Sequence, residues 1–250
     1  MITVLITALG VGGATIIGAA IGFLFKNVNQ KTSDGILSFA AGIMLAASVI
    51  GLIIPSIELG GKFAVLITVV GIFVGAICLS LMDKLIPHAH KFIGIDAEKH
   101  KNGNINKILL FVLAIAIHNL PEGIAAGVSF GAGNQTHALV IAGGVALQNI
   151  PEGIVIIAPM LSVGIKKGKT FLIAAFTGLV EVIGTFLGYF AVNLATVALP
   201  FALAFAGGSM LYVIGDEMIP ETHSHGNQRL STYMLLLGFC VMLAVDFLLG

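Results

Sequence analysis

The side chains with the clearest capacity for chemistry lie in two copies of one short motif. The first copy reads HNLPEGIAAG from His118, and the second reads QNIPEGIVII from Gln148. The glutamate follows four residues later in each copy, so His118 and Glu122 share one helix face, as do Gln148 and Glu152. An imidazole with carboxylates suits Zn, Fe(II), Mn or Cd. If the two helices are antiparallel neighbours, the repeat predicts a site for a divalent transition-metal ion at mid-membrane.

Three glutamates in apolar segments, two of them in the motifs, need a positive partner that the sequence does not supply. Glu122, Glu152 and Glu181 lie deep in apolar runs, and no Lys or Arg lies deep in any such run. One charge at the centre of a membrane helix costs about 2.5–3.5 kcal/mol on insertion scales. A bound cation or protonation is therefore expected to compensate them, although Glu181 alone could pair with a polar group on a neighbouring helix.

Each motif also places a proline inside a helix. Pro121 and Pro151 lack a backbone N–H and push away the carbonyl four residues earlier, at Ile117 and Leu147. Bare carbonyls are tolerated at membrane depth only where they line a cavity or are otherwise satisfied. The prolines therefore favour a functional interpretation of the repeat.

The rest of the chain predicts how the motifs are positioned. Its 250 residues are 58% hydrophobic and only 10% charged, whereas a soluble domain carries about 25% charged residues. Eight apolar runs are long enough to cross a hydrocarbon core of about 30 Å. They cover roughly residues 3–25, 34–55, 63–82, 107–131, 137–162, 169–193, 198–220 and 229–249. The sequence therefore predicts an all-α fold, a single polytopic membrane helix bundle over residues 1–250.

The basic residues predict the orientation of this bundle. Eleven of the 12 fall on one side, and only Lys62 falls on the other. Because Lys and Arg are enriched in cytoplasmic loops, the richer side is predicted to face the cytoplasm, with both termini outside. The formal net charge of zero gives no reason to expect a nucleic-acid partner.

Two groups of polar residues lie on the predicted cytoplasmic side. The only long connection runs from about Asp83 to Asn106 and contains His88, His90 and His100, which could collect metal or simply belong to a solvated loop. The second group, at the end of the seventh run, could line an exit path or form an ordinary solvated helix end. Its members are Asp216, Glu217, Glu221, His223 and His225.

The two motifs resemble those of the ZIP family of divalent metal transporters, and within it the bacterial GufA-like branch. HNLPEG and QNIPEG are specific motifs, and the resemblance covers the whole chain. It implies eight helices in a 3+2+3 arrangement, both termini outside and a metal site, often binuclear, at mid-membrane. It also implies a multi-pass location in the cell (inner) membrane, contact with the lipid bilayer, and a homodimer.

The resemblance assigns a first metal site. His118, Glu122, Gln148 and Glu152 match its ligands. Met44, in the segment AAGIMLAA, lies where the family can add a thioether ligand, although plain helix packing would also explain this methionine.

A second site is matched by Asn119, Asn149 and Glu181, with the two motif glutamates as bridges. Many members of the family begin the second motif with His or carry an acidic residue beside it. Gln148 and Asn149 make the second site less charged in this sequence, so the simultaneous binding of two ions does not follow from the resemblance.

The expected function is transport of a divalent transition-metal ion toward the cytoplasm, with zinc foremost and iron, manganese or cadmium as further substrates. The metal is the cargo, and neither a cofactor nor an enzymatic activity is expected. An intramembrane metalloprotease would need an H-E-x-x-H helix, which this sequence lacks. The alternative is a proton-coupled carrier of small solutes, which would also use buried carboxylates but usually needs Arg or aromatic contacts in a larger polar cavity.

Overall fold

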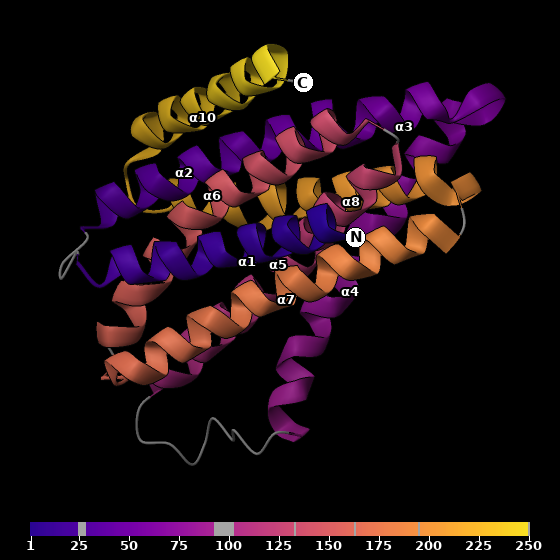
Figure 1. Cartoon of the computed structure of the whole chain (residues 1–250). Helices are drawn as coiled ribbons and strands as arrows, with labels where there is room; N and C mark the ends of the chain where they lie inside the picture. The colour runs from indigo at the N-terminus through magenta and orange to yellow at the C-terminus, as the bar shows by residue number, and fades with distance from the viewer. Residues whose placement is uncertain (25–28, 93–102, 133, 163, 195, 250) are drawn as a thin grey trace.

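Helices account for nearly all of the computed structural model, which describes residues 1–24, 29–92, 103–132, 134–162, 164–194 and 196–249. Figure 1 shows them as long rods running roughly along one direction. The α-helices are α1 (Ile2–Gly22), α2 (Gln30–Ala46), α3 (Ile54–Leu59), α4 (Ala64–Phe92), α5 (Gly103–Ser129), α6 (Gln135–Ser162), α7 (Lys167–Leu194), α8 (Leu199–Val213), α9 (Ile219–His223) and α10 (Gln228–Leu249).

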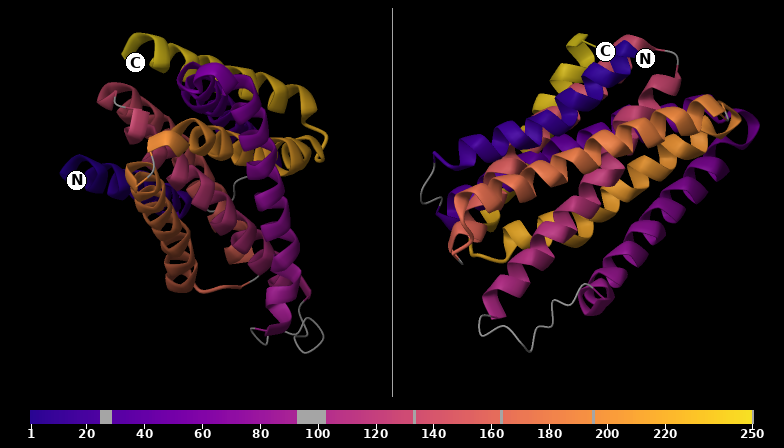
Figure 2. Two further views of the ribbon diagram at one scale, coloured as in Figure 1. Left: turned by 90° about the vertical axis from the view of Figure 1, so that its right-hand side faces the viewer. Right: turned by 60° about the horizontal axis from the view of Figure 1, so that its bottom comes forward.

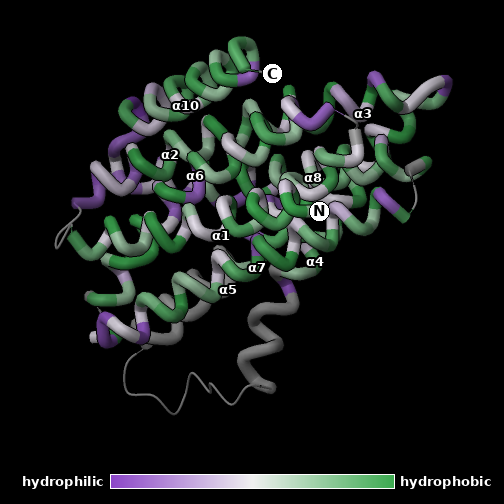
Figure 3. The backbone as a smooth tube through the Cα atoms, in the orientation of Figure 1, coloured by the Kyte–Doolittle hydropathy of each residue, from purple (hydrophilic) through white to green (hydrophobic). Residues whose placement is uncertain are grey.

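The rods match the predicted membrane crossings. Seven helical spans within the described residues are long and apolar enough to cross a bilayer, and α2 with α3, and α8 with α9, each count as one. The eighth rod is α5, a helix of 27 residues. Hydrophobic residues cover most of the rods, and hydrophilic ones gather mainly at helix ends (Figure 3). The prediction of a polytopic, all-helical membrane bundle is therefore confirmed.

Two rods change their winding just before a proline. A π-helical segment, η1 (Ala47–Ile53), joins α2 to α3, and a second, η5 (Ile214–Met218), joins α8 to α9. The ring of a proline clashes with the carbonyl four residues earlier, and for Pro55 and Pro220 that carbonyl lies inside the π-helical segment. The wider winding relieves this clash, and π-helical turns are frequent at functional sites.

The helices associate in two sets that meet near the motifs. One set contains α1, α5, α6 and α7, and the other contains α2, α4, α8 and α10. The sets are joined chiefly where α6 packs on α2 and where α5 packs on α8. Figure 2 shows these sets from two further directions, with both chain termini near the same end of the bundle. The two motif helices therefore lie at the boundary between the sets.

Glycines allow the closest helix contacts. A Cβ built on Gly127 of α5 would lie 2.0 Å from the carbonyl oxygen of Thr185 on α7, and one on Gly188 would lie 2.4 Å from that of Ile124. Small residues let membrane helices approach to backbone contact. The α5–α7 pair therefore depends on glycine at both of its surfaces.

The connection between α4 and α5 is shorter than the predicted segment from Asp83 to Asn106. Helix α4 continues to Phe92 and α5 begins at Gly103, so His88 and His90 belong to a helix. The prediction ended α4 where the apolar run ends, but a helix can extend past the membrane core into water. His100 lies outside the described residues.

Candidate metal-binding site

The two motifs lie on neighbouring helices inside the bundle. His118 and Glu122 belong to α5, Gln148 and Glu152 belong to α6, and all four side chains are buried. Helices α5 and α6 contact each other and follow one another in the chain. The carboxylates of Glu122 and Glu152 lie close enough to interact electrostatically, as do Glu152 and His118. The two motifs therefore lie on adjacent helices, and the joint binding of one ion by these four side chains stays a prediction.

The glycine that ends each motif fixes its helix against a third helix. A Cβ on Gly123 would lie 2.2 Å from the carbonyl oxygen of Glu181 on α7, and one on Gly153 would lie 2.3 Å from that of Thr15 on α1. These two backbone contacts bring each motif directly against a residue whose side chain belongs to the polar cluster described next. The motif glycines therefore set the position of the site, and not only the packing of the helices.

Glu181 is the centre of a cluster of neutral hydrogen-bond donors, which we call the Glu181 cluster. Its Oε1 accepts from Thr15 Oγ1 at 2.6 Å and from Asn119 Nδ2 at 2.5 Å, and its Oε2 accepts from Asn149 Nδ2 at 2.5 Å. Asn149 Nδ2 also donates to the carbonyl oxygen of Val11 at 3.3 Å. The cluster joins α1, α5, α6 and α7, and it satisfies a buried carboxylate without a basic residue.

Glu122 and Glu152, the glutamates of the two motifs, face a cavity of about 460 Å³. It runs from the motifs to the end of the bundle formed by η5 and α9. The residues that line it are Leu37, His118, Glu122, Glu152, Val155, Val213, Asp216, Glu217, Met218, Pro220, Glu221 and Ser224. Five of them are carboxylates and one is a histidine, whereas none is a lysine, an arginine or an aromatic residue. The lining therefore favours a small cation over an organic anion.

His118 pairs across this cavity with a residue of the second helix set. Its Nε2 lies 2.6 Å from Oε1 of Glu217 in η5. This contact ties α5 to the π-helical segment of the α8–α9 rod. The imidazole is therefore directed toward the cavity, and its partner in this conformation is a carboxylate outside the two motifs.

Several buried polar atoms at the motifs have no hydrogen-bond partner among the described residues. These atoms are Asn119 Oδ1, Glu122 Oε2, Asn149 Oδ1 and both amide atoms of Gln148. The Gln148 amide lies near the Glu122 carboxylate, but not in hydrogen-bond geometry. Buried polar atoms are normally paired, so each such atom requires an explanation. Four of the five are oxygen atoms, which are suitable ligands for a divalent cation.

The described side chains do not form a closed metal cage. No three His, Cys, Asp or Glu side chains among them are placed to hold one ion together. Met44 is completely buried in the large apolar cluster that spans both helix sets, and it is not part of the cavity lining. The surroundings of Met44 thus agree with the interpretation that it is a packing residue. The site itself consists of the carboxylates that face the cavity and the amides of the same two motifs.

Two participants had no place in the predicted site. Thr15 donates to Glu181 from α1, and the only signal for it in the sequence is a polar residue near the middle of an apolar run. The sequence places Glu217 in the polar group at the end of the seventh apolar run, since the π-helical segment that turns it toward His118 has no simple sequence pattern.

The chain is similar in sequence to known proteins along most of its length. A family model described as ZIP Zinc transporter matches residues 95–246, which include both motifs and Glu181. The chain is 37% identical to the zinc transporter GufA of Myxococcus xanthus, over 98% of each protein. It is 38% identical to the zinc transporter ZupT of Chlorobaculum parvum, over 95% of this chain and 94% of the relative. It is 33% identical to the human zinc transporter ZIP11, again over 95% and 94%.

The motif glycines provide a test of the site's architecture. A methyl group at Gly153 would lie 2.3 Å from the Thr15 carbonyl oxygen and 2.8 Å from the Ala19 backbone nitrogen, whereas one at Gly143 of the same helix would meet nothing within 4 Å. We expect Gly153→Ala to destabilise the protein by about 1–3 kcal/mol, as overpacking does. Gly143→Ala should be neutral or stabilising by about 0.5–1 kcal/mol. Thermal unfolding in detergent measures both, and equal melting temperatures would contradict the assigned α1–α6 contact.

Proposed function

The chain belongs to the ZIP family of zinc transporters, and from this premise we propose that it carries zinc across the bilayer through the cavity-facing groups of α5 and α6. The observation that supports this proposal best is the cavity lining, in which the described residues supply five carboxylates and one histidine but no lysine or arginine. Such a lining attracts a divalent cation and supplies the oxygen and nitrogen ligands that zinc accepts.

The proposed primary ligands are His118, Glu122, Gln148 and Glu152. Glu122 has an unpartnered carboxylate oxygen, and Gln148 has an unpartnered amide oxygen. His118 can bind through Nε2 once this atom leaves Glu217, whose carboxylate lies 2.6 Å away. Glu217 is therefore the group that would compete with a bound ion for the imidazole.

The Glu181 cluster has a different proposed role. Glu181 already receives three hydrogen bonds, so a second ion on Asn119, Asn149 and Glu181 would have to displace donors that hold the carboxylate. We assign these residues primarily to orienting the motif helices. They would bind a second ion only after the hydrogen bonds to Glu181 break. Met44 would add its thioether only if α2 turned it out of the apolar cluster.

The proposed direction of transport is toward the cytoplasm. The cavity opens at the end of the bundle where α2, α7 and α10 begin, and these helix starts contain Lys31, Lys167, Lys169 and Arg229. Cytoplasmic ends of membrane helices are enriched in basic residues. A cavity that reaches the motifs from this side therefore suits release of the ion into the cytoplasm, from a location in the inner membrane.

The remaining expectations belong to the same proposal. Iron, manganese and cadmium suit the same ligand types as zinc and would be further substrates. Lipid would cover the exposed apolar residues of α4 and α7, and the family resemblance favours a homodimer. A carrier of small organic solutes would need Arg or aromatic contacts, which the described cavity lining does not contain. The relatives are named as transporters, and we assign the chain no enzymatic activity.

Removal of either cavity-facing motif carboxylate is the direct test. We expect Glu122→Gln and Glu152→Gln each to lower zinc uptake into proteoliposomes by at least about tenfold, because loss of a coordinating group outweighs the 10–100-fold effect typical of groups that only support a ligand. Glu58→Gln, an exposed glutamate of α3, is the matched control and should transport normally. Uptake near that of the unaltered chain in either motif variant, at equal protein content, would refute the proposal.

The orientation is tested with single cysteines in a background without Cys78 and Cys240. A cysteine at Lys167 should be protected from a membrane-impermeant maleimide added outside intact cells, and one at Gly250 should react with it. The eleven-to-one distribution of basic residues is the reason for this expectation. Labelling of the Lys167→Cys variant from outside would reverse the proposed direction of transport.

A further inference from the structure

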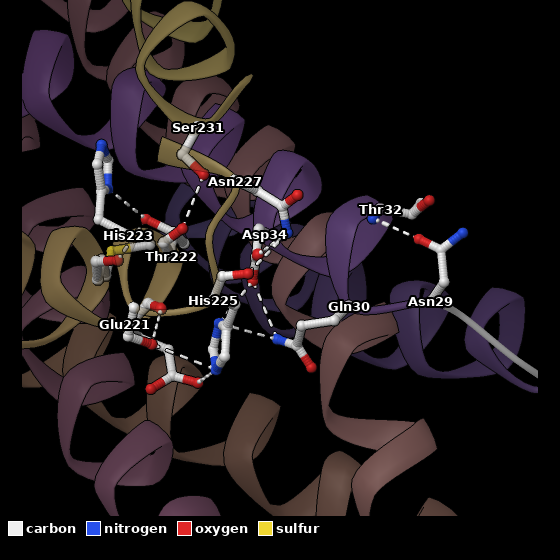
Figure 4. A network of polar contacts seen from close by, with 12 residues as sticks. Asn29, Gln30, Thr32, Asp34, Glu221, Thr222, His223, His225, Asn227 and Ser231 are labelled. Carbon is white, nitrogen blue, oxygen red and sulfur yellow. Dashed lines mark hydrogen bonds and ion pairs between the residues drawn. The ribbon is translucent and has the colours of Figure 1, made fainter. Parts of the chain in front are cut away.

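A network of polar side chains joins the start of α2 to the turn between α9 and α10, beside the mouth of the cavity (Figure 4). Asp34 lies at its centre and is only 2% exposed. Asp34 Oδ1 accepts from Gln30 Nε2 at 3.0 Å and lies 3.1 Å from His225 Nδ1, and Asp34 Oδ2 accepts from Asn227 Nδ2 at 2.9 Å. Neither the metal motifs nor the Glu181 cluster needs this network.

The network favours one tautomer of His225. A carboxylate only accepts hydrogen bonds, so the contact with Asp34 places a proton on Nδ1. Gln30 Nε2 lies 3.2 Å from the same Nδ1, because both nitrogens converge on one oxygen of Asp34. In the neutral imidazole the lone pair is therefore on Nε2. Metal-bound histidines almost always donate their other ring N–H to a carboxylate or carbonyl in this way.

His225 Nε2 faces two oxygen atoms that offer it no proton. Ser224 Oγ lies 3.2 Å away, but its hydroxyl donates to the carbonyl oxygen of Glu221. Glu221 Oε1 lies 3.9 Å away, too far for a hydrogen bond. Two ligand atoms bound tetrahedrally to one zinc ion, each about 2.0–2.2 Å from the metal, lie about 3.4 Å from each other. A movement of well under 1 Å in the exposed Glu221 side chain would place both on one ion.

Glu221 and Ser224 also line the cavity that contains Glu122 and Glu152. An ion that leaves the motifs can therefore reach Glu221 without leaving this cavity. We infer that Glu221 and His225 form a weak site for a divalent transition-metal ion at the cavity mouth, separate from the sites at the motifs. Asp34 is the residue that positions His225. We call Glu221 and His225 the rim pair. The role of the rim pair in transport rests on the proposed function, whereas its ability to bind metal does not.

The chemistry of the rim pair suits release better than storage. Two protein ligands leave the remaining coordination positions to water, and Glu221 is exposed. Structural zinc sites, by contrast, use four protein ligands and hold the ion tightly. A loose site at the mouth takes the ion from the buried carboxylates and passes it to water.

Metal binding to the purified full chain tests the inference when the motif site is disabled. In the Glu122→Gln/Glu152→Gln variant we expect equilibrium dialysis to show one weakly bound Co²⁺ per chain. Adding His225→Gln or Glu221→Gln should weaken this binding at least tenfold. Adding His223→Gln should change it less than twofold, because both ring nitrogens of His223 already contact protein oxygens, on Ile219, Thr222 and Thr232.

Asp34→Asn separates positioning from simple stability. It keeps the size of the side chain, yet it should weaken Co²⁺ binding at the rim pair 10- to 100-fold and change the visible absorption of the bound ion. A purely structural role would lower the melting temperature and leave the absorption of the bound ion unchanged, which would remove Asp34 from the inference.

Two results would overturn the rim pair itself. One is the absence of any bound Co²⁺ in the double variant, which would mean that His225 Nε2 is satisfied by a proton. The other is residual binding that both Glu221→Gln and His225→Gln leave unchanged. Glu221 is exposed, so its variant cannot fail merely by unfolding the core. If instead Glu122→Gln leaves zinc uptake intact while the rim pair binds Co²⁺, the proposed function fails and this site remains.

Discussion

The burial of three carboxylates in apolar helices that contain no Lys or Arg at that depth is the constraint that shapes this protein. The structure meets it in two ways. Glu181 is surrounded by neutral donors from three other helices, so its carboxyl oxygens are satisfied by local hydrogen bonds. Glu122 and Glu152 instead face a cavity lined by further acidic groups. A carboxylate pair in such a cavity needs a cation or a proton, and this need is the basis of the proposed transport of metal.

The packing of the bundle serves the same constraint. Because Gly123 and Gly153 have no side chain, the motif helices pack directly against the backbone of Glu181 and Thr15. The hydrogen-bond donors therefore reach Glu181 without a wide gap between helices. Larger residues at these positions would separate the four helices that share the cluster. On the other side of the cavity, the π-helical segment before Pro220 presents Glu217 to His118. The cavity therefore lies between a tightly packed helix set and a locally unwound rod.

Hydropathy predicted the eight crossings because a membrane-spanning helix requires a long apolar run, and the repeated motif predicted the helices of the site because its ligands recur at helical spacing. The contacts between distant segments could not be predicted in the same way. Thr15 bonds Glu181 across 166 positions in the sequence, and Glu217 reaches His118 only through a π-helical turn. The extension of α4 to Phe92 was also missed, since hydropathy reports the apolar part of a helix and not its hydrogen-bonded end.

The number of protons released when zinc binds shows whether the metal replaces protons on the buried carboxylates. Ligands must be deprotonated to bind metal, so binding to carboxylates that lack a basic partner should release protons, and affinity should fall as pH falls. Calorimetric titration of the purified chain in buffers of different ionisation enthalpy gives this count. We expect at least one proton per zinc near neutral pH, and fewer in the Glu122→Gln/Glu152→Gln variant. A count of zero for the unaltered chain would mean that its buried carboxylates are already ionised and compensated by something other than the metal.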